Sequence, residues 1–159
     1  MTNELANCPI EDIVFAAADE VFSSMLASQI ALADAPVERD GLPYDGVLSV
    51  VGMTGKWVGS GFLICSGPTA ALLASRFLMT EMSSVDDEVL DAIGEITNMI
   101  VGSVKNGLEE RLGAMQLSVP TVVYGKNIRA HLMKSQLRSI IACRGDDWEI
   151  VLRICLTKA

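Results

Sequence analysis

The clearest hydrophobic pattern in the chain is helical and runs from Asp86 to Gly113. Ser83 and Ser84 are candidate N-caps, and Gly113 is expected to end the helix in a left-handed conformation. Aliphatic residues recur between these ends at spacings of three and four, which is the period of one helix face. They are Val89, Ile93, Ile96, Ile100 and Val104, flanked by Leu90, Val101, Leu108 and Leu112. The pattern predicts a long amphipathic helix.

Shorter patterns predict the remaining elements. Helical spacing predicts helices over 9–28 and 68–79, each opened by a proline that suits the first turn. Apolar and alternating runs predict strands over 30–37, 46–53, 57–65, 116–124, 137–143 and 148–156. Residues 125–127 are expected to form a turn, and 128–133 form either a short strand or a loop. Pro120 implies an edge, a bulge or a bend, because proline donates no backbone hydrogen bond.

The order of these elements predicts an α+β fold in which helices pack on a mostly antiparallel sheet. Half of the 159 residues are hydrophobic, which is enough for a sizeable core. No linker or low-complexity tract divides the chain. We therefore expect a single domain over 1–159, with a loose N-terminus over 1–8.

Composition narrows the functional classes. The net charge of −8 and the lack of a basic patch argue against a nucleic-acid partner. No apolar run reaches the roughly 20 residues that span a membrane, and the acidic N-terminus does not resemble a signal peptide. These features predict a cytoplasmic protein with no membrane partner.

Cysteine and histidine offer little catalytic chemistry. Cys65, Cys143 and Cys155 lie in apolar runs and Cys8 stands apart, so buried reduced thiols are expected in place of disulfides or metal ligands. The single histidine, His131, excludes most histidine-based triads within one chain and multi-histidine metal sites. It is expected to be structural, and no metal site is predicted.

The polar face of the long helix is unusual, because two glycines lie in mid-helix. Each glycine costs about 0.8–1 kcal/mol relative to alanine. The face contains Asp91, Gly94, Glu95, Asn98, Gly102, Lys105 and Glu109. One interpretation is a solvated face with two tolerated glycines. The other is a docking face, in which Glu95 and Asn98 project side by side as the working groups.

A weak internal repeat accompanies this face. Residues 19–23 of the first predicted helix resemble residues 94–98 of the long one. Glu20 then corresponds to Glu95, whereas Ser23 stands where Asn98 would be. The similarity is either coincidence or a duplication whose first copy lost its carboxamide, leaving a spent second site.

The spacing Asp91-x-x-x-Glu95-x-x-Asn98, followed downstream by Pro120-Thr121-Val122-Val123, resembles the signature of the CheC/CheX/FliY family of chemotaxis phosphatases. The match is carried by residues 87–127, and the flanking hairpins fit the family layout. A single copy of the signature in a chain this short is most similar to the CheX type. The resemblance implies a CheC/CheX-like three-layer arrangement.

The resemblance also implies a function. The substrate of the family is the aspartyl phosphate of a CheY-like response-regulator receiver domain, and the resemblance implies the same substrate here. Glu95 and Asn98 become the catalytic pair, with Asn98 orienting the attacking water and Glu95 docking the partner. Asp91, Gly94, Met99 and Gly102 are expected to contact that partner, and Pro120 to support the helix structurally. The protein needs no cofactor of its own, because the partner holds the Mg²⁺, and a homodimer formed by sheet continuation is expected.

Two alternatives remain. One is a non-catalytic interaction module of chemotaxis or flagellar signalling, related to CheC and to the FliM middle domain. The intact Glu95 and Asn98 favour catalysis over this module. The other is a self-contained hydrolase for a small molecule, which would require a second catalytic group that the sequence does not contain.

Overall fold

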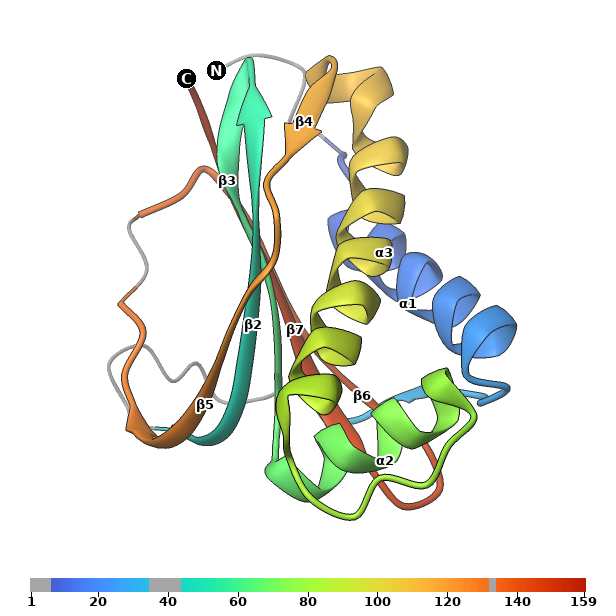
Figure 1. Cartoon of the computed structure of the whole chain (residues 1–159). Helices are drawn as coiled ribbons and strands as arrows, with labels where there is room; N and C mark the ends of the chain where they lie inside the picture. Colours follow the sequence, from blue (N-terminus) through green and yellow to red (C-terminus); the bar gives the residue numbers. More distant parts are fainter. Residues whose placement is uncertain (1–6, 35–43, 132–133) are drawn as a thin grey trace.

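The computed structural model describes residues 7–34, 44–131 and 134–159. Its elements are α1 (Ile10–Met25), β1 (Ala31–Leu32), β2 (Tyr44–Gly55), β3 (Trp57–Cys65), α2 (Gly67–Leu78), α3 (Asp87–Leu112), β4 (Met115–Leu117), β5 (Thr121–Ile128), β6 (Leu137–Arg144) and β7 (Glu149–Lys158). Figure 1 shows how the three helices gather on one side of the strands.

The strands form one seven-stranded sheet in the order β1-β6-β7-β3-β2-β4, and β5 pairs with a second stretch of β2. All pairings are antiparallel. The hairpin of β2 and β3 pairs Val47 with Cys65, and the hairpin of β6 and β7 pairs Leu137 with Leu156. The predicted α+β class with a mostly antiparallel sheet is confirmed.

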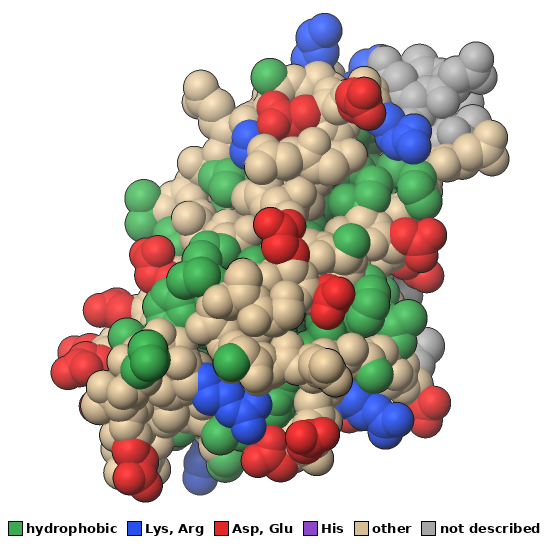
Figure 2. Space-filling view, turned by 90° about the vertical axis from the view of Figure 1, so that its right-hand side faces the viewer, with side chains coloured by type: hydrophobic (Ala, Val, Ile, Leu, Met, Phe, Trp, Pro, Cys, Tyr) green, Lys and Arg blue, Asp and Glu red, His purple; other side chains and the backbone are tan. Residues whose placement is uncertain are grey.

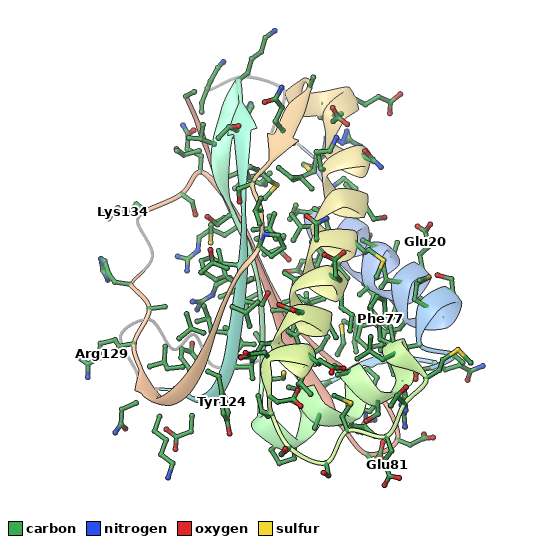
Figure 3. The ribbon with its side chains drawn as sticks, viewed as in Figure 1. Glu20, Phe77, Glu81, Tyr124, Arg129 and Lys134 are labelled. Carbon is green, nitrogen blue, oxygen red and sulfur yellow. The ribbon has the colours of Figure 1, made fainter. Side chains whose placement is uncertain are left out.

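The helices cover one face of this sheet (Figure 1). Helix α3 lies against β2, β3 and β5, while α1 contacts β6, α2 contacts β2, and both contact α3. On the other side of the sheet lies the connection from β5 to β6, where Arg129 and Lys134 point away from the helices (Figure 3). Among the described residues, no helix lies on this side of the sheet.

Helix α3 begins and ends through local chemistry. Its N-cap is Asp86, whose side chain accepts a hydrogen bond of 3.0 Å from the backbone N–H of Val89. The prediction of Ser83 or Ser84 as the cap was wrong, because the first turn starts at Asp87 and both serines lie too far upstream. The helix ends at Gly113 with the expected positive φ of 85°, but its ψ of 173° places it outside the left-handed helical conformation. The predicted aliphatic stripe is buried in the core.

Proline and glycine divide the strands differently from the prediction. Pro120 separates β4 from β5, so residues 116–124 do not form one strand. Residues 125–127 were predicted to be a turn and belong to β5, where pairing with β2 shifts between Tyr44 and Gly46. Asn127, at a φ of 56°, donates its backbone N–H to Asp45 Oδ1. This irregularity lets β5 follow β2 past a turn-forming sequence.

Two predicted segments lie partly outside the described residues. The strand predicted over 30–37 contains only β1, and residues 35–37 are not described. Of the segment 128–133, Ile128 ends β5, residues 129–131 form no strand, and 132–133 are not described. Residues 1–6 of the expected loose N-terminus also lie outside the described part of the chain.

The order of the strands in the sheet has an internal two-fold symmetry. The order β1-β6-β7-β3-β2-β5 is unchanged when β1 exchanges with β5, β2 with β6, and β3 with β7. The same exchange relates α1, which packs on β6, to α3, which packs on β2. Helix α2 and strand β4 have no counterpart. This arrangement favours the duplication over the coincidence that the sequence left open.

All four cysteines are free thiols, and Cys65, Cys143 and Cys155 are buried, whereas Cys8 is half-buried. Burial raises the pKa of Cys65 and of Cys143 to about 12, which keeps both thiols protonated and inert at neutral pH. Within the described ranges, no helix is both long and apolar enough to cross a membrane.

Candidate functional site

Helix α3 presents the predicted polar residues along one side. Asp91 and Glu95 are exposed, and Asn98 follows one turn further on, where it is half-buried. Residues three and four apart share a helix face, so the three side chains form a row. Among the described residues, neither Glu95 nor Asn98 has a hydrogen-bond or ionic partner. Both groups are therefore available to a ligand.

A groove of about 460 Å³ lies beside this row, between α3 and the connection from β4 to β5. Its lining residues are Asp87, Leu90, Asp91, Gly94, Glu95, Val119, Pro120 and Val122. The structure thus brings Asp91, Gly94, Glu95 and Pro120 together. Asn98, Met99 and Gly102 do not line the groove and follow it along the helix toward the C-terminal end; all three are half-buried.

Gly94 lets the strand approach the helix closely. A Cβ built on Gly94 would lie 3.3 Å from Val122 Cγ2 and 3.5 Å from Pro120 Cβ. The glycine is buried at the floor of the groove, so its missing side chain makes room for the protein's own strand. The contact with a partner that the sequence suggested for Gly94 stays a prediction. Gly102 is less confined, with Leu117 Cδ1 at 3.6 Å as its neighbour.

Ser118 fixes the opposite wall of the groove. Its backbone N–H donates to the carbonyl of Gly52 at 2.9 Å, and its Oγ accepts from the N–H of Gly52 at 2.8 Å. The same hydroxyl donates to the carbonyl of Val119 at 3.1 Å. The connection from β4 to β5 is therefore tied to β2, although it is not itself a strand.

Four groove residues were not predicted as site residues from the sequence: Asp87, Leu90, Val119 and Val122. Val119 is the exposed hydrophobic residue among them. Its side chain is 85% exposed at the rim. Val119 falls within the strand predicted over 116–124, in which alternate side chains would face the core. The available signal was its position directly before Pro120, which restricts a residue to extended conformations and marks a break in pairing.

The groove is acidic. Asp87, Asp91 and Glu95 line it, and no lysine or arginine does. Figure 2 shows acidic side chains across the helical side of the molecule, with hydrophobic side chains between them. No cluster of histidine, cysteine, aspartate and glutamate in the described part of the chain could hold a metal ion. The groove fits a ligand or partner that brings a positive charge.

The corresponding pair on α1 is engaged within the protein. Glu20 is an exposed residue of α1 (Figure 3). One of its carboxylate oxygens accepts from Ser103 Oγ at 3.3 Å, while the hydroxyl of Ser23 donates to the Glu20 backbone carbonyl at 3.2 Å. A serine hydroxyl bonded to its own helix does not replace the free carboxamide of Asn98. His131 is exposed and does not line the groove.

The sequence profile of the family described as Chemotaxis phosphatase CheX matches residues 47–144, which is more than half of the chain. The CheY-P phosphatase CheX of Thermotoga maritima is 32% identical over 84 residues, which cover 52% of this chain and 54% of that protein. The chain therefore spans about half the length of this relative.

Solved structures show the same fold. A chemotaxis protein CheX from Desulfovibrio desulfuricans has a TM-score of 0.81 and 26% identity, covering 94% of this chain and 99% of that one. The CheX–CheY–BeF₃–Mg²⁺ complex from Borrelia burgdorferi contains a chain with a TM-score of 0.77 and 22% identity, covering 92% and 97%. Because the profile match includes α3, the groove and Pro120, the chain belongs to the chemotaxis phosphatase CheX family.

Proposed function

We propose that this protein hydrolyses the aspartyl phosphate of a CheY-like receiver domain. The observation that carries the proposal is the free pair of Glu95 and Asn98, one turn apart on a rigid helix beside an open acidic groove. The names of relatives support it, since the Thermotoga maritima protein is a CheY-P phosphatase and the Borrelia burgdorferi protein was solved with CheY.

The reaction requires positioning more than acid–base strength. Water attacks the phosphorus in line, the bond from phosphorus to the aspartyl oxygen breaks, and the carboxylate leaves with its electron pair. Phosphoryl transfer of this kind is accelerated mainly by orientation and by charge stabilisation. The receiver supplies Mg²⁺ for the phosphoryl charge, so this protein must supply a correctly placed water.

Asn98 is suited to hold that water. Its carboxamide offers an N–H donor and a carbonyl acceptor, so it orients a water molecule from both sides without being a strong base. Because the side chain has no partner among the described residues, no internal bond must break before it acts. Its backbone is held by α3, whose aliphatic face is buried against the sheet.

Glu95 and Asp91 are suited to dock the partner. Both carboxylates are exposed at the groove, where they can pair with a lysine or arginine of the receiver. A docked receiver would cover this side of α3 and bring its phosphoryl group toward Asn98. Met99 lies one turn beyond Glu95, and Gly102 lies two turns beyond it. Both would lie under the same partner.

The test measures the decay of phosphorylated receiver domains from the source organism, in Mg²⁺, with and without this protein. We expect acceleration by the wild type, loss of about a hundredfold or more in maximal rate for Asn98→Ala, and a raised half-saturating concentration for Glu95→Ala. Asn106→Ala is the matched control, because Asn106 is exposed on the same helix two turns beyond Asn98.

Three outcomes decide the proposal. A wild type that binds a phosphorylated receiver without accelerating its decay would favour the non-catalytic module. Full activity in both Asn98→Ala and Glu95→Ala would refute the site. Loss of activity in Asn106→Ala as well would show that the variants act through the helix and not through one side chain.

The homodimer formed by sheet continuation also stays a proposal. Strand β1 pairs only with Cys143 and Arg144, and within the described residues the outer edge of β6 from Leu137 to Ile141 has no strand partner. An open edge of this length is able to pair with a second copy. Light scattering that detects only monomer at working concentration would remove the proposal.

A further inference from the structure

We propose that Val119 is an apolar anchor for the phosphorylated receiver, and that it sets affinity for this partner without taking part in the chemistry. The inference rests on the proposed function and adds a recognition residue on the wall opposite α3. It is carried by three properties of Val119: its exposure, its rigid support and its position in the groove.

Exposure alone is common for a valine on a protein surface and would carry no argument. The side chain of Val119 is 85% exposed, whereas the neighbouring apolar groups Leu90, Pro120 and Val122 are half-buried. Val119 therefore stands above the apolar floor of the groove. A partner that enters the groove must contact it.

The backbone on both sides of Val119 is held in place, although the residue lies outside any strand or helix. The three hydrogen bonds of Ser118 tie the preceding residue to Gly52 and to the carbonyl of Val119 itself. On the other side, Pro120 has a fixed φ and lies against Gly94. A residue whose backbone is held in this way loses little backbone conformational entropy when it binds, which is how preorganised contacts raise affinity.

The position of Val119 determines its partner. It shares the groove with Asp87, Asp91 and Glu95, so one partner surface would meet an apolar contact and carboxylates together. A receiver docked through a basic group on Glu95 would cover the groove on which Val119 stands. An apolar centre flanked by charged contacts is the usual anatomy of a specific protein interface.

The experiment uses the receiver domain that the wild type dephosphorylates fastest, with its concentration varied to separate KM from kcat. We expect Val119→Asp to raise KM at least tenfold and Val119→Ala to raise it about threefold, with kcat within twofold of the wild type. Binding of the same receiver loaded with Mg²⁺ and beryllium trifluoride should weaken by the same factors. Asn98→Ala should instead lower kcat.

Met79→Asp is the matched control, because Met79 is 91% exposed and does not line the groove. It should leave KM, kcat and binding unchanged. An equal rise in KM for Met79→Asp would indicate a general effect of added negative charge and would overturn the inference.

The outcomes separate the inference from the proposed function. If the wild type is active and Val119→Asp keeps its KM and its binding, Val119 is not an anchor and the proposed function stands. If the wild type dephosphorylates no receiver, both fail. If Val119→Asp lowers the thermal midpoint by several degrees, the test is made with Val119→Ser instead. An unchanged KM in Val119→Ser overturns the inference, and a raised KM supports it.

Discussion

Gly94 faces Pro120 so closely that a Cβ built on the glycine would lie 3.5 Å from the Cβ of the proline. This contact joins the helix that carries Glu95 and Asn98 to the connection that carries Val119. It limits the width of the groove, because a side chain longer than that of alanine at position 94 would push the two walls apart.

We expect substitutions of Gly94 to separate helix propensity from packing. Gly94→Ala gains up to about 1 kcal/mol of helix propensity but places its Cβ 3.3 Å from Val122 Cγ2, so its free energy of unfolding should stay within about 1 kcal/mol of the wild type. Gly94→Leu should cost about 1–3 kcal/mol through overpacking and should also reduce the proposed phosphatase activity. Urea unfolding and the phosphate-release assay measure both effects.

Gly102→Ala is the control for Gly94. Its Cβ would meet only Leu117 Cδ1 at 3.6 Å, an ordinary contact, so the variant should be stabilised by about 0.5–1 kcal/mol. A Gly94→Leu variant as stable as the wild type would contradict the packing role assigned to this glycine.

We expect Ser118→Ala to loosen the wall of the groove. The variant loses the side-chain acceptor for Gly52 N–H and the donor to Val119 carbonyl, and it should be destabilised by about 0.5–1.5 kcal/mol, because water replaces these exposed bonds only in part. Under the proposed function, KM for the receiver should rise while kcat changes little, because the substitution leaves Asn98 in place.

Ser103→Ala provides the comparison for Ser118. It removes a single side-chain hydrogen bond, to Glu20 on α1, away from the groove. Its stability should fall by no more than that of Ser118→Ala, and its KM should equal that of the wild type. A rise in KM of equal size in both variants would show that loss of stability, and not the position of the wall, affects binding.

We expect the stability of the protein to fall at alkaline pH through its buried thiols. The pKa of Cys65 and that of Cys143 are raised from 9.0 to about 12 by burial, so the folded state keeps protons that the unfolded chain releases. The stabilisation is complete below pH 9 and is lost between pH 9 and 12, by at most about 1.4 kcal/mol per pH unit for each thiol.

Urea unfolding at pH 8, 9 and 10 measures this dependence. The double variant Cys65→Ala, Cys143→Ala should lose stability less steeply over the same range, because neither position can then ionise. A double variant with the same slope as the wild type would assign the alkaline loss to other groups. In the native protein at pH 8, both thiols should also resist alkylation.

Much of the local structure follows from the sequence alone. The three- and four-residue spacing determined which face of α3 is buried, and the alternating runs determined both hairpins, because burial of one face leaves a periodic pattern. The spacing of Asp91, Glu95, Asn98 and Pro120 also indicated the family, which the profile match shows. These features depend on residues that are near neighbours in the chain.

Only the tertiary structure decided what lies against each face. The sequence did not show that Pro120 and Val122 lie against Gly94. Residues 125–127 were predicted to turn, and strand β2 holds them within β5. Val119 became a groove residue because Ser118 is bonded to Gly52, which is distant in sequence. A periodic pattern indicates that one face of a helix or strand is buried. It does not indicate which residues bury that face, because those residues come from distant parts of the chain.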